Sequence, residues 1–175
     1  MAVIGKAFYN LMRDEGKWLV DSDGQTYKGI CRKYWPNWEG WKIIDSTIEL
    51  NLPDFPAILE TLPELQVKVL EFYKENFFDP IRFEDIKLQS VAESIFNFAV
   101  NDGVKTTVKM VQSVLEVKQD GIFGPITLET LNSISKQMFL LIFFKMKIRH
   151  RADICNKNKS KTKNLLGWIN RDLKY

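Results

Sequence analysis

The chain has 175 residues, of which 45% are hydrophobic and 27% are charged, and this composition excludes a disordered protein. It is typical of one good core or of two small coupled lobes. The two cysteines, Cys31 and Cys155, lie far apart and outside any C-x-x-C arrangement, so neither a zinc ribbon nor a disulfide scaffold is indicated.

Charge is unevenly distributed along the sequence. Residues 145–175 carry a net charge of +8, whereas residues 1–144 carry −5. A basic end of this kind fits an anionic polymer, which on charge alone could be cell wall, membrane surface or nucleic acid. The alternative is a solvated, charged loop around residues 157–163.

The first segment carries apolar residues at the spacing of a single helix face. They are Ile4, Ala7, Phe8, Leu11 and Met12. Continuing this face by four residues from Leu11 reaches Glu15, and Gly16 follows as a helix stop. The sequence therefore predicts a carboxylate on the inward face of the last helical turn.

Residues 21–30 are too rich in turn-forming residues for a helix, and they predict a loop or a short hairpin. A cluster of tryptophans follows, made of Trp35, Trp38 and Trp41. Aromatic residues make up 13% of the chain, and exposed aromatic faces are where sugar rings commonly stack. Core packing is the alternative for each tryptophan.

Helices are expected over residues 64–76, 88–101 and 104–117, and another is expected to open at Gly124-Pro125, because proline suits a first helical turn. The most apolar run, residues 138–144, is much shorter than the roughly 20 residues that span a bilayer, so it predicts a buried helix and no stable membrane insertion. The fold class expected is all-α, mainly helical with room for a small hairpin.

Several short motifs follow one another along the N-terminal part of the chain. Glu15-Gly-Lys-Trp18 is followed by Asp23-Gly24 and then by Thr26-x-x-Gly29-Ile30. Together they resemble the E-G-G-Y…G-G-x-T-x-x-G-I signature of glycoside hydrolase family 108, which are lysozyme-like N-acetylmuramidases common in phages and prophages. Lys17 and Trp18 stand where that signature has its second Gly and its Tyr.

The resemblance continues downstream. Phe96-Asn-Phe-Ala-Val-Asn-Asp-Gly103 is similar to the family's F-D-x-A-V-N-x-G, with Asn97 in place of its Asp. The segment 111–127 resembles the family's peptidoglycan-binding L-Q…D-G-x-x-G-P-x-T, and Gly167-Trp168-Ile-Asn-Arg171 matches a G-W-x-x-R closing motif. Each motif is a weak signal alone, but five in register cover most of the chain.

The resemblance implies a lysozyme-like two-lobed fold, with a catalytic region over residues 1–88 and a helical, peptidoglycan-binding-like region over residues 89–175 that shares the cleft. It implies hydrolysis of the β-1,4 bond between N-acetylmuramic acid and N-acetylglucosamine, as in an endolysin. The implied partner is the glycan strand of peptidoglycan rather than nucleic acid. No cofactor and no metal are implied.

A secretory signal would need an apolar core of about 7–15 residues and a small-residue cleavage site. Residues 1–8 show neither feature. We therefore expect a protein that is made in the bacterial cytoplasm and acts on the cell wall after release or after export by another route.

Glu15 is the candidate general acid. Glycosidic cleavage near neutral pH needs a carboxylic acid that is still protonated and can donate to the leaving oxygen. An inward-facing position removes water from the carboxylate, and the negative end of the helix dipole disfavours its charge, so both features would raise its pKa. The alternative is a Glu that merely accepts hydrogen bonds at a helix end.

The sequence leaves the second catalytic group open. An inverting reaction places a carboxylate roughly 6.5–9.5 Å from the acid, and a retaining reaction places it about 5–5.5 Å away. Asp21 and Asp23 lie in a segment that could fold back over Glu15, with Asp23 slightly favoured, and each could instead form a turn. Thr26, at the family's Thr position, could hold a water by hydrogen bonding.

Candidate substrate contacts come from the same motifs. They are Trp18, Tyr27, Asn97, Asn101, Gln112 and Trp168. The segment 111–127 has two interpretations, either a unit that holds wall peptide or glycan, or simply the second lobe of the catalytic fold.

Two other functions stay open on the sequence. A lytic transglycosylase would cut the same bond with the same acid but would close the muramyl sugar on itself, which gives a product lighter by one water. A non-catalytic wall-binding or secretion-assisting protein would keep the fold, and it would bind cell walls without lowering their turbidity.

Overall fold

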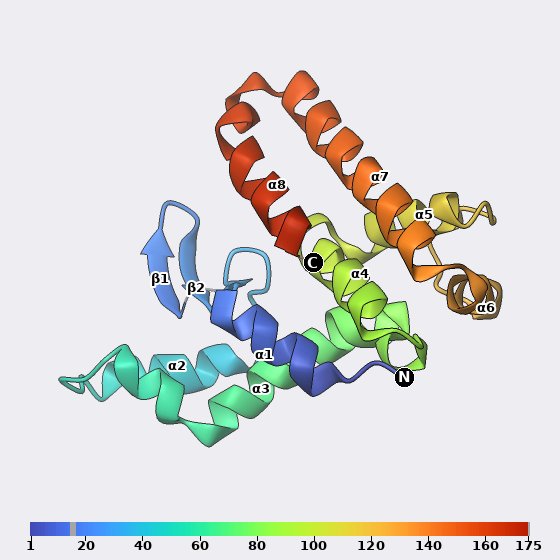
Figure 1. Cartoon of the computed structure of the whole chain (residues 1–175). Coiled ribbons are helices and arrows are strands. Elements are labelled where there is room, and N and C mark those ends of the chain that lie inside the picture. The colour runs from blue at the N-terminus through green and yellow to red at the C-terminus, as the bar shows by residue number, and fades with distance from the viewer. Residues whose placement is uncertain (15–16, 175) are drawn as a thin grey trace. The chain divides into compact units, whose positions relative to one another are not determined.

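The structure is a computed structural model that describes residues 1–14 and 17–174 (Figure 1). Within these ranges it has eight α-helices and one small antiparallel sheet of three strands, which confirms the expected all-α class with a small hairpin. The chain divides into two compact units. We call residues 5–76 the hairpin unit, and residues 1–4 together with residues 77 onward the helical unit.

The division falls between Asn76 and Phe77, before the boundary expected after residue 88. The reason is an aromatic cluster that ties the intervening segment to the helical unit. Phe78 stacks on Phe96 with ring centroids 4.0 Å apart, and Phe83 meets Phe78 edge-on at 4.9 Å. The assignment of a catalytic role to residues 1–88 and a wall-binding role to residues 89–175 stays a prediction.

The hairpin unit begins with α1, which spans Ile4–Asp14. Ala7 and Leu11, four residues apart, are buried, and Phe8 packs edge-on against Tyr73 with ring centroids 5.9 Å apart. The inward face of α1 is therefore the one expected from the sequence.

The sheet consists of β1 (Trp18–Asp21), β2 (Gly24–Tyr27) and β3 (Ile30–Cys31), in that order. The turn between β2 and β3 has Lys28 and Gly29 at its centre, with φ of +45° and +80°. Positive φ at both central residues is the geometry of a type I′ turn, which matches the twist of paired strands and favours glycine. The T-x-x-G-I motif therefore encodes this turn.

Two helices complete the hairpin unit. They are α2 (Gly40–Glu49) and α3 (Pro63–Tyr73), which pack against each other. Proline occupies the first turn of α3, where its missing N–H costs nothing, and the helix ends in a π-helical turn over Lys74–Phe78. The helix expected over residues 64–76 is thus confirmed with shifted ends.

The helical unit contains the remaining five helices that the structure describes. They are α4 (Gln89–Asp102), α5 (Val104–Val114), α6 (Pro125–Ser133), α7 (Lys136–Lys157) and α8 (Leu165–Lys174). Helices α4, α5 and α7 pack together, and α8 folds back along α7 after a 3-10 turn over Lys159–Asn164 (Figure 1).

The apolar run at residues 138–144 lies in α7 and is buried on one face only. Phe139 and Phe143 are fully buried, whereas Met138 and Leu141 are 52% and 54% exposed. The prediction of a buried helix was therefore wrong for Met138 and Leu141, because successive helical residues point to different sides. No helix of residues 1–14 and 17–174 combines the length and the apolar character that crossing a membrane requires.

The buried face of α7 continues into charged residues. Lys147 follows Phe143 by four residues and is only 2% exposed. Its Nζ donates to the hydroxyl of Ser94 at 2.9 Å and lies 4.9 Å from the centre of the Phe143 ring. Burial lowers the pKa of Lys147 to about 8 from its ordinary value of 10.5.

The buried amine predicts a specific pH dependence of stability. Below pH 8 Lys147 is protonated in both the folded and the unfolded chain, so the cost of burying its charge is fully present. Between pH 8 and 10.5 the folded chain loses this proton while the unfolded chain keeps it, so stability rises with pH. The rise from this one group corresponds to about 3 kcal/mol.

Urea unfolding of the wild type and of Lys147→Met, at about pH 7 and about pH 10, measures this effect. We expect the free energy of unfolding of the wild type to increase relative to that of the variant when the pH is raised. The variant serves as the reference because all other titrating groups are common to both proteins. A constant difference between the two proteins would contradict the prediction.

Candidate functional site

Glu15, the expected general acid, and Gly16 lie outside the described residues. Helix α1 ends at Asp14, and strand β1 begins at Trp18. The part of the motif that the structure describes is therefore the hairpin that follows Glu15.

The hairpin sorts the other motif residues onto two faces. Trp18 pairs with Tyr27 across the strands, and Leu19 pairs with Thr26. Because side chains alternate along a strand, Thr26 shares one face with Leu19 and Asp21, while Tyr27 shares the opposite face with Trp18. The candidate water-holding and sugar-contacting residues thus point to different sides of the sheet.

Both candidate carboxylates lie at the β1–β2 turn and are already engaged there. The carboxylate of Asp21 accepts the backbone N–H of Asp23 at 2.8 Å, and the carboxylate of Asp23 lies 2.8 Å from Nζ of Lys33. For Asp21 this is the turn-forming arrangement that was the alternative to a catalytic role, whereas the side chain of Asp23 forms an ion pair. The hydroxyl of Thr26, by contrast, has no hydrogen-bond partner within residues 1–14 and 17–174.

Tyr27 is fully buried, so it offers no surface to a sugar, contrary to the expectation from the sequence. Its hydroxyl lies 3.1 Å from both the carbonyl oxygen of Leu59 and a carboxylate oxygen of Glu60, and it accepts from Nε2 of Gln66 at 3.0 Å. Burial raises the pKa of the Tyr27 phenol above its usual range. The residue anchors the hairpin to α3 and to the turn before it.

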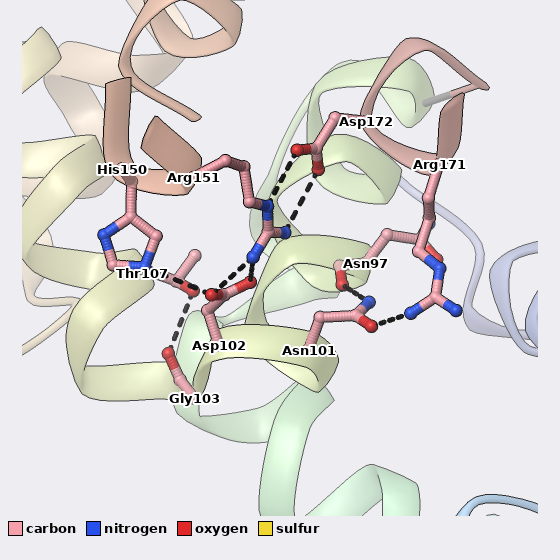
Figure 2. A network of polar contacts seen from close by, with 9 residues as sticks. All are labelled: Asn97, Asn101, Asp102, Gly103, Thr107, His150, Arg151, Arg171 and Asp172. Carbon is pink, nitrogen blue, oxygen red and sulfur yellow. Dashed lines mark hydrogen bonds and ion pairs between the residues drawn. The ribbon is translucent and has the colours of Figure 1, made fainter. Parts of the chain in front are cut away.

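The candidate contacts of the second motif lie on α4 (Figure 2). Asn97 is buried, and its side-chain amide donates to the carbonyl oxygen of Glu93 at 2.9 Å. Asn101 is exposed, donates to the carbonyl oxygen of Asn97 at 2.6 Å and accepts from Nη1 of Arg171. Of the two, Asn101 is the one with surface available to a ligand.

Next to these residues, buried charges connect three helices (Figure 2). Nη1 of Arg151 in α7 lies 2.6 Å from each carboxylate oxygen of Asp102 in α4. Nε of Arg151 lies 3.1 Å from Asp172 in α8, and Nε2 of His150 lies 3.1 Å from Asp102. Trp168, a candidate contact, is half-buried with its ring 5.3 Å from the Arg151 guanidinium.

This charge cluster was not among the candidates chosen from the sequence. A signal for it was present, because steps of four residues from Phe143 reach Lys147 and then Arg151 on the same face of α7. Its two carboxylates, at positions 102 and 172, each directly follow a motif residue, Asn101 and Arg171.

Gln112 is buried at the centre of its own motif. Its Oε1 accepts the backbone N–H of Gly121 at 2.9 Å, and its Nε2 donates to Asp120 at 2.8 Å and to the carbonyl oxygen of Ile122 at 2.9 Å. The N–H of Ile122 and the Gln112 amide hold the pKa of Asp120 below its usual range. Gln112 therefore shapes the loop between α5 and α6 and presents no free surface to a ligand.

Within residues 1–14 and 17–174, no group of three or more His, Cys, Asp or Glu side chains is arranged to hold a metal ion. Asp102 and His150 do lie close together, but Arg151 supplies the charge that balances this carboxylate.

Two family models match the chain. One, described as glycosyl hydrolase 108, matches residues 8–103, which is more than half of the chain, and the other, described as a predicted peptidoglycan domain, matches residues 106–173. The chain belongs to the glycosyl hydrolase 108 family. The family expected from the motifs is confirmed, and with it a glycoside hydrolase that acts on peptidoglycan.

The solved structure of SagA from Brucella abortus is similar to this glycosyl hydrolase 108 protein. It has a TM-score of 0.64 and 22% sequence identity, and the match covers 98% of this chain and 94% of that one. At this identity the likeness shows the fold. No curated protein matches the chain.

The position of Gln112 predicts a structural effect on substitution. Gln112→Ala should lower the free energy of unfolding by about 2–3 kcal/mol, because the N–H of Gly121 would lose its buried acceptor. It should also speed amide hydrogen exchange at Gly121. Urea unfolding and hydrogen exchange measure both effects.

The matched control is Gln119→Ala, which removes an exposed glutamine from the same loop and should be silent. Wild-type stability combined with weaker binding to cell walls would instead make Gln112 a ligand contact.

Proposed function

We propose that this protein hydrolyses the β-1,4 bond between N-acetylmuramic acid and N-acetylglucosamine in peptidoglycan, with Glu15 as the general acid. The match of the glycosyl hydrolase 108 family over residues 8–103 carries this proposal, because it includes the motif that begins at Glu15. The described neighbours support it. Ala7 and Leu11 lie on the buried face of α1, and Glu15 is the next residue at the same spacing.

We further propose that Thr26 positions the attacking water. The hydroxyl of Thr26 is without a partner in the described ranges, while Asp21 holds the turn and Asp23 pairs with Lys33. This reverses the preference for Asp23 that the sequence suggested. The physical reason is that the carboxylate of Asp23 already pairs with Lys33, so a water would have to compete with this lysine for it.

Two features of the helical unit support the proposal that the protein binds the cell wall. The region matched by the predicted peptidoglycan domain contains a cavity of about 240 Å³ beside the Gln112 loop, with Ile122 and Ile126 exposed at its edge. The 3-10 turn between α7 and α8 adds exposed lysines at 159, 161 and 163, whose charge fits an anionic wall polymer.

The central prediction concerns Glu15→Gln. This change removes the transferable proton while keeping the size of the side chain, so it should lower the lysis of purified sacculi by roughly a hundredfold or more. The free energy of unfolding should stay near that of the wild type. Turbidity loss measures the activity, and the mass of the products shows whether water was added.

Near-wild-type lysis by a folded Glu15→Gln protein would contradict the role of Glu15. Anhydro products from the wild type would instead assign the chain to the lytic transglycosylases.

A second prediction separates the water-positioning candidates. Thr26→Val keeps the shape but removes the hydroxyl, so it should lower turnover about tenfold or more with little change in wall binding. Asp21→Asn and Asp23→Asn should affect turnover only mildly. All three variants should be assayed on the same sacculi, with folding checked by circular dichroism.

A steep loss in either Asn variant, with Thr26→Val active, would return the role to that carboxylate. Full activity in all three variants would place the second group elsewhere in the chain.

A further inference from the structure

The hairpin unit contains a groove of about 640 Å³, and among the residues that the structure describes neither Thr26 nor Asp21 nor Asp23 lines it. It lies between the tryptophan segment that precedes α2 and one side of α3. Its lining combines four aromatic side chains, Phe72 among them, with three carboxylates. The members that the proposal uses are Tyr34, Trp35, Trp38, Glu39, Glu71 and Glu75. A volume of this size is in the range of cavities that hold ring-sized organic ligands.

The rings of Trp35 and Trp38 are fixed by contacts within the hairpin unit. Trp35 packs edge-on against Phe72 at 4.8 Å between ring centroids, and Nε1 of Trp38 donates to the carbonyl oxygen of Lys68 at 3.2 Å. A Cβ at Gly40 would lie 2.3 Å from the Trp38 indole, so only glycine leaves room for this ring. Rings fixed in this way lose little conformational freedom when a ligand binds.

These rings also keep free surface. Tyr34 is 65% exposed and Trp35 is 38% exposed, although Trp35 belongs to a packed cluster. Trp35 is therefore packed and still partly exposed, which is typical of a binding surface rather than of a core.

The carboxylates of the groove are better suited to accept hydrogen bonds from a ligand than to bind a free cation. Nζ of Lys68 lies 2.8 Å from Glu39 and 3.1 Å from Glu71, so a lysine of the protein already balances part of their charge. A small cation would also leave the exposed faces of Tyr34 and Trp35 uncovered. A ligand with apolar ring faces and several O–H or N–H donors can contact the aromatic rings and also donate to the carboxylates of the lining.

We propose that this groove binds N-acetylated sugar rings of a glycan strand, as a binding site additional to Glu15 and Thr26. The C–H face of a sugar ring stacks on Trp35 and Tyr34, and its hydroxyl and acetamido N–H groups donate to the carboxylates. The identity of the ligand rests on the proposed action on peptidoglycan. The groove holds the strand in the hairpin unit while the chemistry proceeds at the E-G motif.

The five tryptophans provide local reporters for the test. Full-length Glu15→Gln protein, labelled with fluorotryptophan, is titrated with a linear tetramer of N-acetylglucosamine and followed by fluorine NMR. We expect the Trp35 and Trp38 signals to shift with the tetramer. The Trp18 signal reports occupancy next to the E-G motif, and the Trp168 signal reports binding to the helical unit.

Three substitutions in the labelled background should weaken the shift-derived affinity about tenfold or more. They are Trp35→Ala, Tyr34→Ala and Glu75→Gln. The last two change exposed side chains that the fold does not need, so they test the groove even if Trp35→Ala loosens the packing on Phe72. Tyr9→Ala is the matched control, since Tyr9 is an exposed aromatic of the same unit outside the groove.

The proposal is overturned if the tetramer shifts Trp18 but not Trp35 or Trp38, or if Tyr34→Ala and Glu75→Gln bind like Tyr9→Ala. It is also overturned if free lysine shifts the groove signals and displaces the tetramer, because the groove would then be a cation site. A failure of the proposed function is recognised separately, since it appears as lysis by Glu15→Gln and leaves these binding measurements unaffected.

Discussion

Arg151 brings a full positive charge into the interior of the helical unit, and the arrangement of α4, α7 and α8 depends on its being balanced there. Moving an ion out of water costs several kcal/mol, and this cost is offset only when its partners lie at hydrogen-bond distance. Asp102 comes from the end of α4 and Asp172 from α8, each within 3.1 Å of the guanidinium. Sliding one helix by a turn would leave a buried charge unpaired, at a cost of about 3–5 kcal/mol. The cluster therefore fixes the register of three helices more than it adds net stability. Lys147, one turn earlier in α7, is also a buried charge that needs a partner, and Ser94 of α4 provides it.

In the hairpin unit, too, a buried polar group fixes the position of an element, but here the group is the neutral hydroxyl of Tyr27. A sheet of strands this short is marginal by itself. Tyr27 stabilises it by burying a whole ring and by placing its hydroxyl among Glu60, Gln66 and the carbonyl of Leu59. Because strand side chains alternate, fixing Tyr27 on the inner face also fixes Thr26 on the other. The proposed water-holding hydroxyl is thus positioned by a residue that is itself fully buried.

The sequence predicted what depends on local periodicity. The inward face of α1, the hairpin after Asp21 and the start of α6 at Pro125 follow from spacing and turn chemistry, and the structure has each of them. It did not predict which polar motif residues are buried, because burial depends on partners far along the chain. Tyr27 meets Glu60 and Gln66, more than thirty positions away, and no local pattern shows this. The charges of α7 were missed for a different reason, since the apolar run ends at Phe144 and the buried face continues beyond it with charged residues.

The matched motifs therefore divide by what their residues do. Gly29 makes a type I′ turn, Gln112 shapes the loop before α6, and Asn97 bonds to its own helix, so these positions specify the fold. A motif match built on such residues is strong support for the architecture and weaker support for any one chemical step. The chemistry has to come from polar or aromatic groups that the fold does not use for its own contacts. Thr26 and Trp35 are of that kind, because strand pairing places the first and packing on Phe72 places the second, and neither contact uses up the capacity to bind.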